Sequence, residues 1–255
     1  LHFLFYPDFS KLSWGGVLIA LGHSFFTLSL ASGVMITYGA YMPAKVSIVR
    51  TSLWIALADT SVALLAGMVI YPIVFAHGLD AGQGPGLIFV TLPVAFGQMP
   101  GGAIVATLFF VMLVFAAFTS TIAMIESVVA WLVQSKGVSR VQACIGSGVV
   151  LWLLSLLTVA SFAGVSWTQF EFNFLGKQVH NLFDVIDHLT SDILLPLTGL
   201  AMALFAGWVL KREITLQELN TNQITYSIWR FAIRWITPLA VFAVFLNLTG
   251  IIQNN

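Results

Sequence analysis

The stretch FFTLSLASG, Phe25–Gly33, lies within a segment that is otherwise apolar enough for the lipid core of a membrane. It places Thr27, Ser29, Ser32 and Gly33 within about two helical turns of one another. A hydroxyl can donate a hydrogen bond back to its own helix, but four small residues so close together weaken a helix and leave backbone oxygens free. We interpret the stretch as a place where a polar group binds inside the membrane.

The composition of the whole chain is that of a membrane protein. Of its 255 residues, 59% are hydrophobic and 8% are charged, whereas a soluble domain carries roughly 25% charged residues. The formal net charge is zero, which gives no indication of a nucleic-acid partner, and the eight Trp fit anchoring at membrane interfaces. The single cysteine, Cys144, lies in an apolar run and offers neither a disulfide nor a metal cluster.

Windows of about 20 apolar residues predict six membrane spans in a single membrane domain over residues 1–255. Their ranges are 14–41, 53–76, 103–134, 142–163, 181–210 and 228–252. The segment 77–102 is apolar in its middle but contains Gly and Pro throughout, so we predict a structured external loop with short helices rather than a seventh span. The expected fold class is an all-α integral membrane protein.

The positions of Lys and Arg predict the orientation of the spans. Basic pairs follow the first, third and fifth spans, namely Lys45 and Arg50, Lys136 and Arg140, and Lys211 and Arg212. The opposite connections hold only Lys11 and Lys177. We therefore expect the basic connections in the cytoplasm and both ends of the chain outside. Because the chain starts at Leu without a signal-like segment, we expect an odd number of spans before it in a parent protein, with a removed signal as the alternative.

Ionisable side chains inside a span are costly, so each is a candidate for function. His23 and Thr27 lie four residues apart and share a helix face, although a buried His bonded to a neighbouring helix explains His23 equally well. Asp59 lies about one turn inside the second span and needs a cation, a His or several donors. A helix-capping or interfacial Asp is the alternative for that residue.

The third span carries a stripe of small and hydroxyl-bearing residues in FAAFTSTIAMIE. Ala116, Thr119, Ser120 and either Ala123 or Met124 recur at spacings of three and four, so they share one side of a helix. Close helix packing explains such a stripe best, but adjacent hydroxyls also suit a hard cation. For Glu126, nearer the cytoplasmic half, a partner and a snorkelling role both stay open.

The fifth span begins with the stretch NLFDVIDHLTSD, which is rich in ionisable residues. Asp184, Asp187 and His188 are expected near the outer surface, where acids at a helix start are commonly solvated and suit the helix dipole. One of them could instead close an external vestibule by pairing with an Arg, although no Arg of this chain is expected on that side.

Six segments, in this order and at these separations, resemble the second half of a bacterial neurotransmitter:sodium symporter. They are ALGHSFFTLSLASGVMITYGAYMP, ALADTSVALLAG, GLIFVTLPVAFGQMPGG, FAAFTSTIAMIESVVAWL, LFDVID and RWITP. The resemblance covers essentially the whole chain and implies transmembrane helices six to eleven of the leucine-transporter fold. In that fold two inverted five-helix repeats hold substrate and sodium at broken helices near the membrane midplane. This chain would supply the second repeat plus one extra helix, and FFTLSLASG would be the unwound part of helix six.

The resemblance implies roles for individual residues around the substrate. Phe26 would be the aromatic lid over the substrate, and Asp187 would be the acidic partner of an external gate whose Arg belongs to the first helix. The other implied substrate-binding positions are Thr27, Ser29, Ser32, Ser120 and Met124.

Two sodium sites are implied as well. Thr27 and Asp59 would bind the first sodium, and the Ala116 carbonyl with the hydroxyls of Thr119 and Ser120 would bind the second. No organic cofactor is implied.

Three departures from the family pattern bear on ions and substrate. Asp59 replaces the usual Asn, and His23 replaces a common Gln. We therefore hypothesise that Asp59, with His23 close by, supplies a fixed negative charge in place of chloride. Ala31 and Ser32 lie in a segment where relatives commonly have Gly, a larger apolar residue and then Gly, so that bulk is lost at Ser32. This change would enlarge or polarise the pocket, and we expect a neutral amino acid as substrate.

The expected function is sodium-coupled symport of a neutral amino acid across the bacterial inner membrane, with no enzyme activity. The expected partners are the amino acid, sodium, the lipid bilayer and a missing N-terminal half, and a homodimer stays open. The alternative is a non-transporting half-protein or scaffold that needs a separate N-terminal half. An intramembrane hydrolase built on Ser32 and His23 is disfavoured, because a spacing of nine places the two residues on nearly opposite helix faces.

Overall fold

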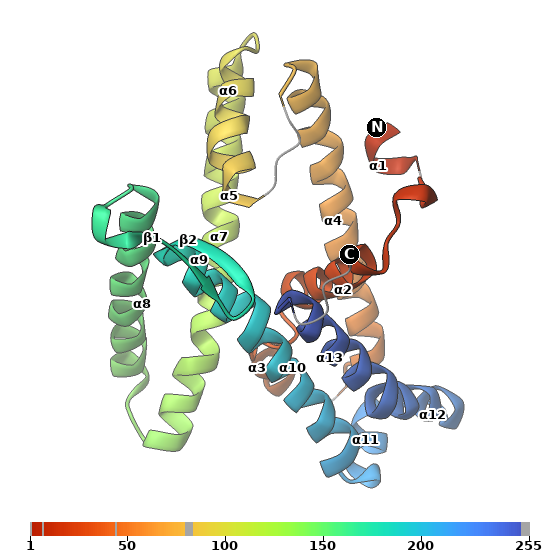
Figure 1. Cartoon of the computed structure of the whole chain (residues 1–255). Helices are drawn as coiled ribbons and strands as arrows, with labels where there is room; N and C mark the ends of the chain where they lie inside the picture. The colour runs from red at the N-terminus through yellow and green to blue at the C-terminus, as the bar shows by residue number, and fades with distance from the viewer. Residues whose placement is uncertain (1, 7, 44, 80–83, 251–255) are drawn as a thin grey trace. The chain divides into compact units, whose positions relative to one another are not determined.

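The computed structural model describes residues 2–6, 8–43, 45–79 and 84–250, which are predominantly helical (Figure 1). The chain forms two compact units. The first combines the N-terminal residues up to Lys11 with Trp54–Ile122, and the second combines Leu12–Leu53 with the chain from Ala123 onward. Two long helices, α4 (Ile48–Ala76) and α7 (Gly102–Lys136), contribute residues to both units.

The first unit is built around the helical connection between α4 and α7. Besides these helices it contains α1 (His2–Phe5), η1 (Phe9–Lys11), α5 (Gly84–Gly86), η2 (Leu87–Thr91) and α6 (Leu92–Gly97). Val74, Leu92 and Phe96 form its buried apolar cluster, and the Phe96 ring lies 5.6 Å from that of Phe109. The stretch Gly84–Gly97 is therefore a short apolar helix packed on α4 and α7. Residues 80–83 of the expected loop lie outside the described residues.

The turn from α6 into α7 depends on a glycine. A Cβ added at Gly102 would lie 1.7 Å from the Phe96 carbonyl oxygen, closer than any side chain allows. The Gly-rich run GQMPGG thus permits the chain to reverse direction tightly before the longest helix.

The second unit contains the remaining helices. They are α2 (Trp14–Thr27), α3 (Val34–Tyr41), α8 (Arg140–Phe162), η3 (Ser166–Thr168), α9 (Leu182–Asp187), η4 (His188–Leu194), α10 (Leu195–Leu204), η5 (Phe205–Val209), α11 (Arg212–Leu219), α12 (Gln223–Phe231), η6 (Ala232–Ile236) and α13 (Thr237–Leu248). The segments from α9 to η5 form one long helix, as do those from α12 to α13.

Helices α2, α10 and α13 pack against one another in this unit, with α10 and α13 side by side (Figure 1). Small residues permit the close approach. A Cβ at Gly22 would lie 3.1 Å from Val244 of α13, and one at Gly199 would lie 3.6 Å from Ala31 Cβ. Ala31 is itself buried.

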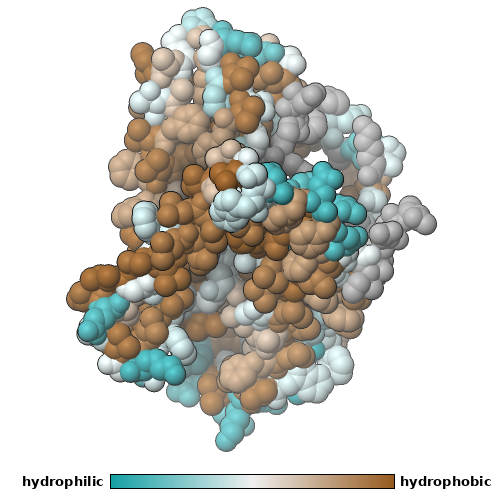
Figure 2. All heavy atoms as spheres, turned by 60° about the vertical axis from the view of Figure 1, so that its left-hand side comes forward, coloured by the Kyte–Doolittle hydropathy of each residue, from teal (hydrophilic) through white to brown (hydrophobic). Residues whose placement is uncertain are grey.

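Among the described residues, five helices are long and apolar enough to span a membrane. They cover Ile48–Ala76, Gly102–Lys136, Arg140–Phe162, Leu182–Val209 and Gln223–Leu248. Most of the face visible in Figure 2 is hydrophobic, as expected for a surface that lipid or other membrane segments cover. The predicted span 14–41 consists of two shorter helices, α2 and α3, and the end of the predicted span 228–252 lies outside the described residues. The chain is a multi-pass membrane protein of the all-α class.

A short β-hairpin after α8 is absent from the sequence-based expectations. Strands β1 (Gln169–Phe174) and β2 (Lys177–Asn181) pair antiparallel across a turn at Leu175 and Gly176, both with positive φ. The alternating pattern of QFEFNF followed by Leu-Gly was the available signal. A Cβ at Gly176 would lie 2.0 Å from the Thr249 carbonyl oxygen, so only Gly allows the hairpin tip to rest on the end of α13.

Candidate functional site

The polar stretch Phe25–Gly33 interrupts a helix. Helix α2 ends at Thr27 and α3 begins at Val34, with residues 28–33 between them in a non-helical conformation. Ser29 has φ of 51° and Gly33 has φ of 84°. A positive φ at a residue other than Gly is uncommon and is found mostly at specialised positions. The interruption that the resemblance implied is therefore present.

Hydroxyl groups hold the ends of this interruption. The Ser32 hydroxyl donates to the Ser29 carbonyl at 3.0 Å. The Thr37 hydroxyl donates to the Gly33 carbonyl at 3.1 Å and lies 3.2 Å from the hydroxyl of Ser127 on α7. A Cβ at Gly33 would lie 3.4 Å from that same Ser127 oxygen. The start of α3 is thus fixed against α7 by small and hydroxyl-bearing residues.

The candidate residues around the interruption are exposed or half-buried. Phe26 is 59% exposed, and His23 and Thr27 are exposed on the last turns of α2. Ser29 and Ser32 are half-buried in the interruption, whereas Met124 on α7 is exposed. The structure therefore brings His23, Phe26 and Thr27 together with a non-helical backbone at one end of α2.

The remaining ion-site candidates belong to the first unit. Asp59 is half-buried on α4, and Ala116, Thr119 and Ser120 are exposed on α7. The Thr119 hydroxyl donates to the carbonyl oxygens of Phe115 at 3.1 Å and Ala116 at 3.0 Å. A hydroxyl that donates backward to its helix keeps oxygen lone pairs for a cation.

No group of three or more His, Cys, Asp and Glu side chains that could hold a metal occurs among the described residues. The oxygen donors at the candidate positions are mainly hydroxyls and backbone carbonyls, with the single carboxylate of Asp59. Hard oxygen donors of this kind suit alkali and alkaline-earth cations better than transition metals.

Asp187, the expected gate residue, is the last residue of α9 and is half-buried. Its carboxylate accepts a hydrogen bond from the Ser191 hydroxyl at 3.2 Å, and its backbone carbonyl accepts one from Thr190 at 3.2 Å. Asn181 caps α9 through the Asp184 amide at 2.9 Å. Asp184 thus lies in the first turn of α9, where an acid is electrostatically favoured.

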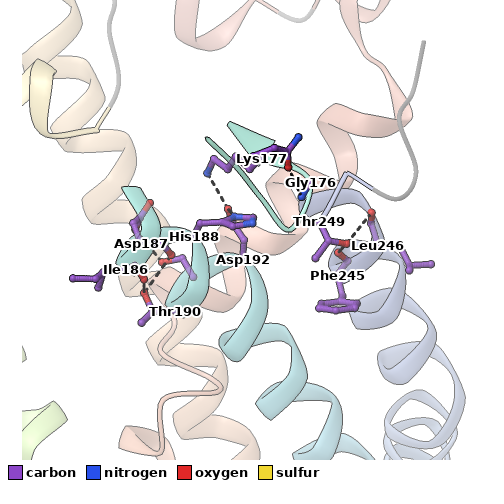
Figure 3. Close-up of polar contacts among 12 residues, drawn as sticks. Gly176, Lys177, Ile186, Asp187, His188, Thr190, Asp192, Phe245, Leu246 and Thr249 are labelled. Atoms are coloured by element: carbon purple, nitrogen blue, oxygen red, sulfur yellow. Dashed lines mark hydrogen bonds and ion pairs between the residues drawn. The ribbon is translucent and has the colours of Figure 1, made fainter. Parts of the chain in front are cut away.

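His188, the third ionisable residue expected near the start of this span, is fully buried and is therefore not among the solvated ones. Its Nδ1 lies 2.8 Å from Asp192 Oδ2, and the same oxygen lies 2.9 Å from Lys177 Nζ (Figure 3). The Phe174 ring stands edge-on to the imidazole with centroids 5.9 Å apart. Sequence reasoning missed Asp192, although the spacing of four from His188 was a usable signal. The hairpin supplies both Lys177 and Phe174. Because the hairpin was not predicted, the contacts of these two residues with Asp192 and His188 could not be predicted either.

Glu126 has partners, which answers the question that the sequence left open. Its two carboxylate oxygens accept hydrogen bonds from Tyr41 Oη at 2.9 Å and Arg140 Nη2 at 2.7 Å. These contacts connect the end of α3, the last third of α7 and the start of α8.

Comparisons with known proteins agree with this architecture. The model of the family described as "Sodium:neurotransmitter symporter family" matches residues 1–254. The chain is 35% identical to the uncharacterized sodium-dependent transporter YhdH of Bacillus subtilis, over 98% of this chain and 55% of the relative. It is 31% identical to an uncharacterized sodium-dependent transporter of Haemophilus influenzae, over 94% of this chain and 52% of the relative.

A solved structure shows the same fold. The crystal structure of MhsT in complex with L-phenylalanine superposes with a TM-score of 0.84 at 39% identity, and the match covers 97% of this chain and 55% of MhsT. The chain spans about half the length of the curated relatives that it matches. The family and these neighbours are transporters and not enzymes. With its interrupted helix and its similarity to MhsT, the chain belongs to the sodium:neurotransmitter symporter family and has the leucine-transporter fold.

Proposed function

We propose that this chain carries substrate- and sodium-binding residues for the symport of a neutral amino acid. The observation that carries the proposal is the interruption between α2 and α3, where non-helical backbone lies within an apolar membrane segment. Free backbone groups at such a depth are tolerated where they line a cavity or bind a ligand. An amino acid, which carries both charges and a side chain, is the class of ligand that such groups recognise.

The substrate would contact the residues next to the interruption. Phe26 would cover it, and the hydroxyls of Ser29 and Ser32 would bind its polar groups. Thr27 and Ser120 would add hydroxyls, and Met124 an adaptable apolar wall. That MhsT was solved with L-phenylalanine supports a neutral and sizeable substrate.

Sodium would bind to oxygen donors in both parts of the chain. Thr27 and Asp59 would contribute to a first ion, and the Ala116 carbonyl with Thr119 and Ser120 to a second. Binding of sodium and of substrate would be reciprocal, because each would stabilise the conformation that the other requires. Asp187 would be the acidic member of an external gate.

Asp59 would also supply the negative charge that makes chloride unnecessary, with His23 close by. The Asp59→Asn variant should therefore lose most transport in chloride-free medium and regain part of it when chloride is added. Thr60→Val is the matched control, because the Thr60 hydroxyl donates to the Ala56 carbonyl of its own helix, at 2.9 Å. Full activity of Asp59→Asn without chloride would contradict this role.

The transporter would lie in the bacterial inner membrane with its basic connections in the cytoplasm and both ends of this segment outside. The deciding experiment is uptake of a panel of labelled amino acids into proteoliposomes that contain the full-length protein. We expect uptake of at least one neutral amino acid in a sodium gradient and none when potassium replaces sodium. Equal uptake in both gradients would contradict sodium coupling, and no uptake of any amino acid would favour a non-transporting component.

A further inference from the structure

A basic cavity lies where α11 and α12 meet, outside every residue assigned above to substrate or sodium. It has a volume of about 470 Å³ and is lined by Arg212, Arg230 and Arg234 together with Tyr226, Phe231 and Trp235. All of these residues belong to the second unit. We propose that this cavity binds the phosphate headgroup of an anionic phospholipid.

The charge of the cavity is not compensated. Its lining contains three Arg and no Asp or Glu, and no ion pair involving these Arg occurs among the described residues. Arg230 is held by neutral groups instead, at 2.8 Å from Tyr226 Oη and 3.4 Å from Thr215 Oγ1. Arg230 and Arg234 lie on a membrane helix and Arg212 lies beside it on α11, and without an acid these three cations favour an anion that offsets their repulsion.

Arg234 gives a second, independent sign of a missing partner. Its guanidinium stacks on the Trp208 ring at 4.6 Å, and its buried Nε makes no hydrogen bond within the described part of the chain. Buried donors are normally satisfied, so an unpaired one next to a cavity indicates a ligand. The planar fork of Arg matches the oxygens of a phosphate group, which makes phosphate the best-fitting anion.

An apolar stripe beside the cavity distinguishes a lipid from free phosphate. Exposed large side chains recur every three or four residues from α12 into α13, and they are Ile224, Ile228, Phe231, Trp235, Leu239 and Phe242. Phe231 and Trp235 also line the cavity and are 60% and 51% exposed. A headgroup in the cavity would therefore place its acyl chains along this stripe.

The length of the helix agrees with an interfacial position. The span Gln223–Leu248 has 26 residues, whereas about 20 cross the hydrocarbon core. The first turns of α12 can thus reach the headgroup layer, where Trp and Arg are favoured and where basic clusters bind anionic lipid.

Lipid binding to the purified full-length protein in detergent tests the proposal, with native mass spectrometry as the readout. The probes are phosphatidylglycerol, phosphatidylcholine and inorganic phosphate. We expect retention of phosphatidylglycerol but not of phosphatidylcholine. The double variant Arg230→Gln, Arg234→Gln should weaken that retention about tenfold or more, since two charge-assisted contacts are lost. Lys136→Gln is the matched control, because Lys136 is a basic residue that lies over Trp131, outside the cavity.

The following results of the lipid-retention experiment would contradict the proposal. Equal retention of phosphatidylglycerol by the double variant and the control, or equal retention of phosphatidylcholine, would overturn the proposal. Inorganic phosphate that displaces the phospholipid completely at equal concentration would show a simple anion site and would overturn the role of the stripe. If the double variant is not monodisperse, Arg212→Gln carries the same test, because Arg212 is exposed and its loss leaves the buried contacts in place.

Discussion

Gly33 adopts a left-handed φ of 84° directly before α3, with Ser127 of α7 beside it. Any other residue would be strained there by about 1–2 kcal/mol. Small and hydroxyl-bearing residues in the first predicted span were visible in the sequence, and they mark the place where the helix is interrupted. The left-handed φ of Ser29 could not be predicted from the sequence, because Ser has no strong preference for that conformation.

We predict that Gly33→Ala lowers stability by about 1–2 kcal/mol and weakens sodium-dependent substrate binding. Gly39→Ala is the matched control on α3, where an added Cβ meets no atom within 4 Å. That control should be neutral or stabilising by up to about 1 kcal/mol. Thermal unfolding in detergent measures both variants, and equal midpoints would show that the interruption does not depend on Gly33.

Asp192 accepts from both His188 and Lys177, so its charge ties the β-hairpin to the helix that carries Asp187. We predict that Asp192→Asn costs about 1–3 kcal/mol, because buried His188 would lose its charged partner. Glu171→Gln is the control, since Glu171 pairs with His180 at 3.4 Å on an exposed part of the hairpin. An exposed pair contributes little, so a loss of stability in Glu171→Gln equal to that in Asp192→Asn would contradict this account.

At the scale of elements, the sequence predicts the long apolar helices well. It predicts the β-hairpin and the short helices that pack on them poorly. Spans two to six correspond to continuous helices because runs of apolar residues have few other stable forms in a membrane. The hairpin and the short helix Gly84–Gly97 depend on tertiary contacts such as Gly176 with Thr249 and Phe96 with Phe109. Burial of His188 under Phe174 and the Arg-lined cavity at α12 depend on the same kind of contact and were not foreseen.

The family motifs assigned more residues to the candidate site than the periodicity of the sequence did. Spacing alone placed Thr119 and Ser120 on one helix side and favoured simple packing, while the resemblance assigned them to sodium. The Thr119 hydroxyl, bonded to the Ala116 carbonyl, is consistent with either role. Only a measurement that responds to sodium separates the two.

At the scale of the whole molecule, the distribution of Lys and Arg predicts which side of the membrane each connection faces. A cysteine introduced by Gln178→Cys in the hairpin should react with an impermeant maleimide in intact cells. A cysteine introduced by Gln217→Cys in α11 should react only after permeabilisation. Both positions are exposed, so accessibility within the protein does not limit either reaction. The reverse labelling pattern would invert the proposed orientation.

The central claim, that sodium binding at these helices supports substrate binding, is tested most directly by a sodium titration of amino-acid binding. Thr119→Val and Thr121→Val form the matched pair, because both hydroxyls donate to carbonyls of α7 but lie on nearly opposite sides of it. We predict that Thr119→Val raises the sodium concentration for half-maximal binding about tenfold or more, the loss of roughly one charge-assisted contact, while Thr121→Val leaves it unchanged. Equal shifts in both variants, or substrate binding that is independent of sodium in the unaltered protein, would contradict the account.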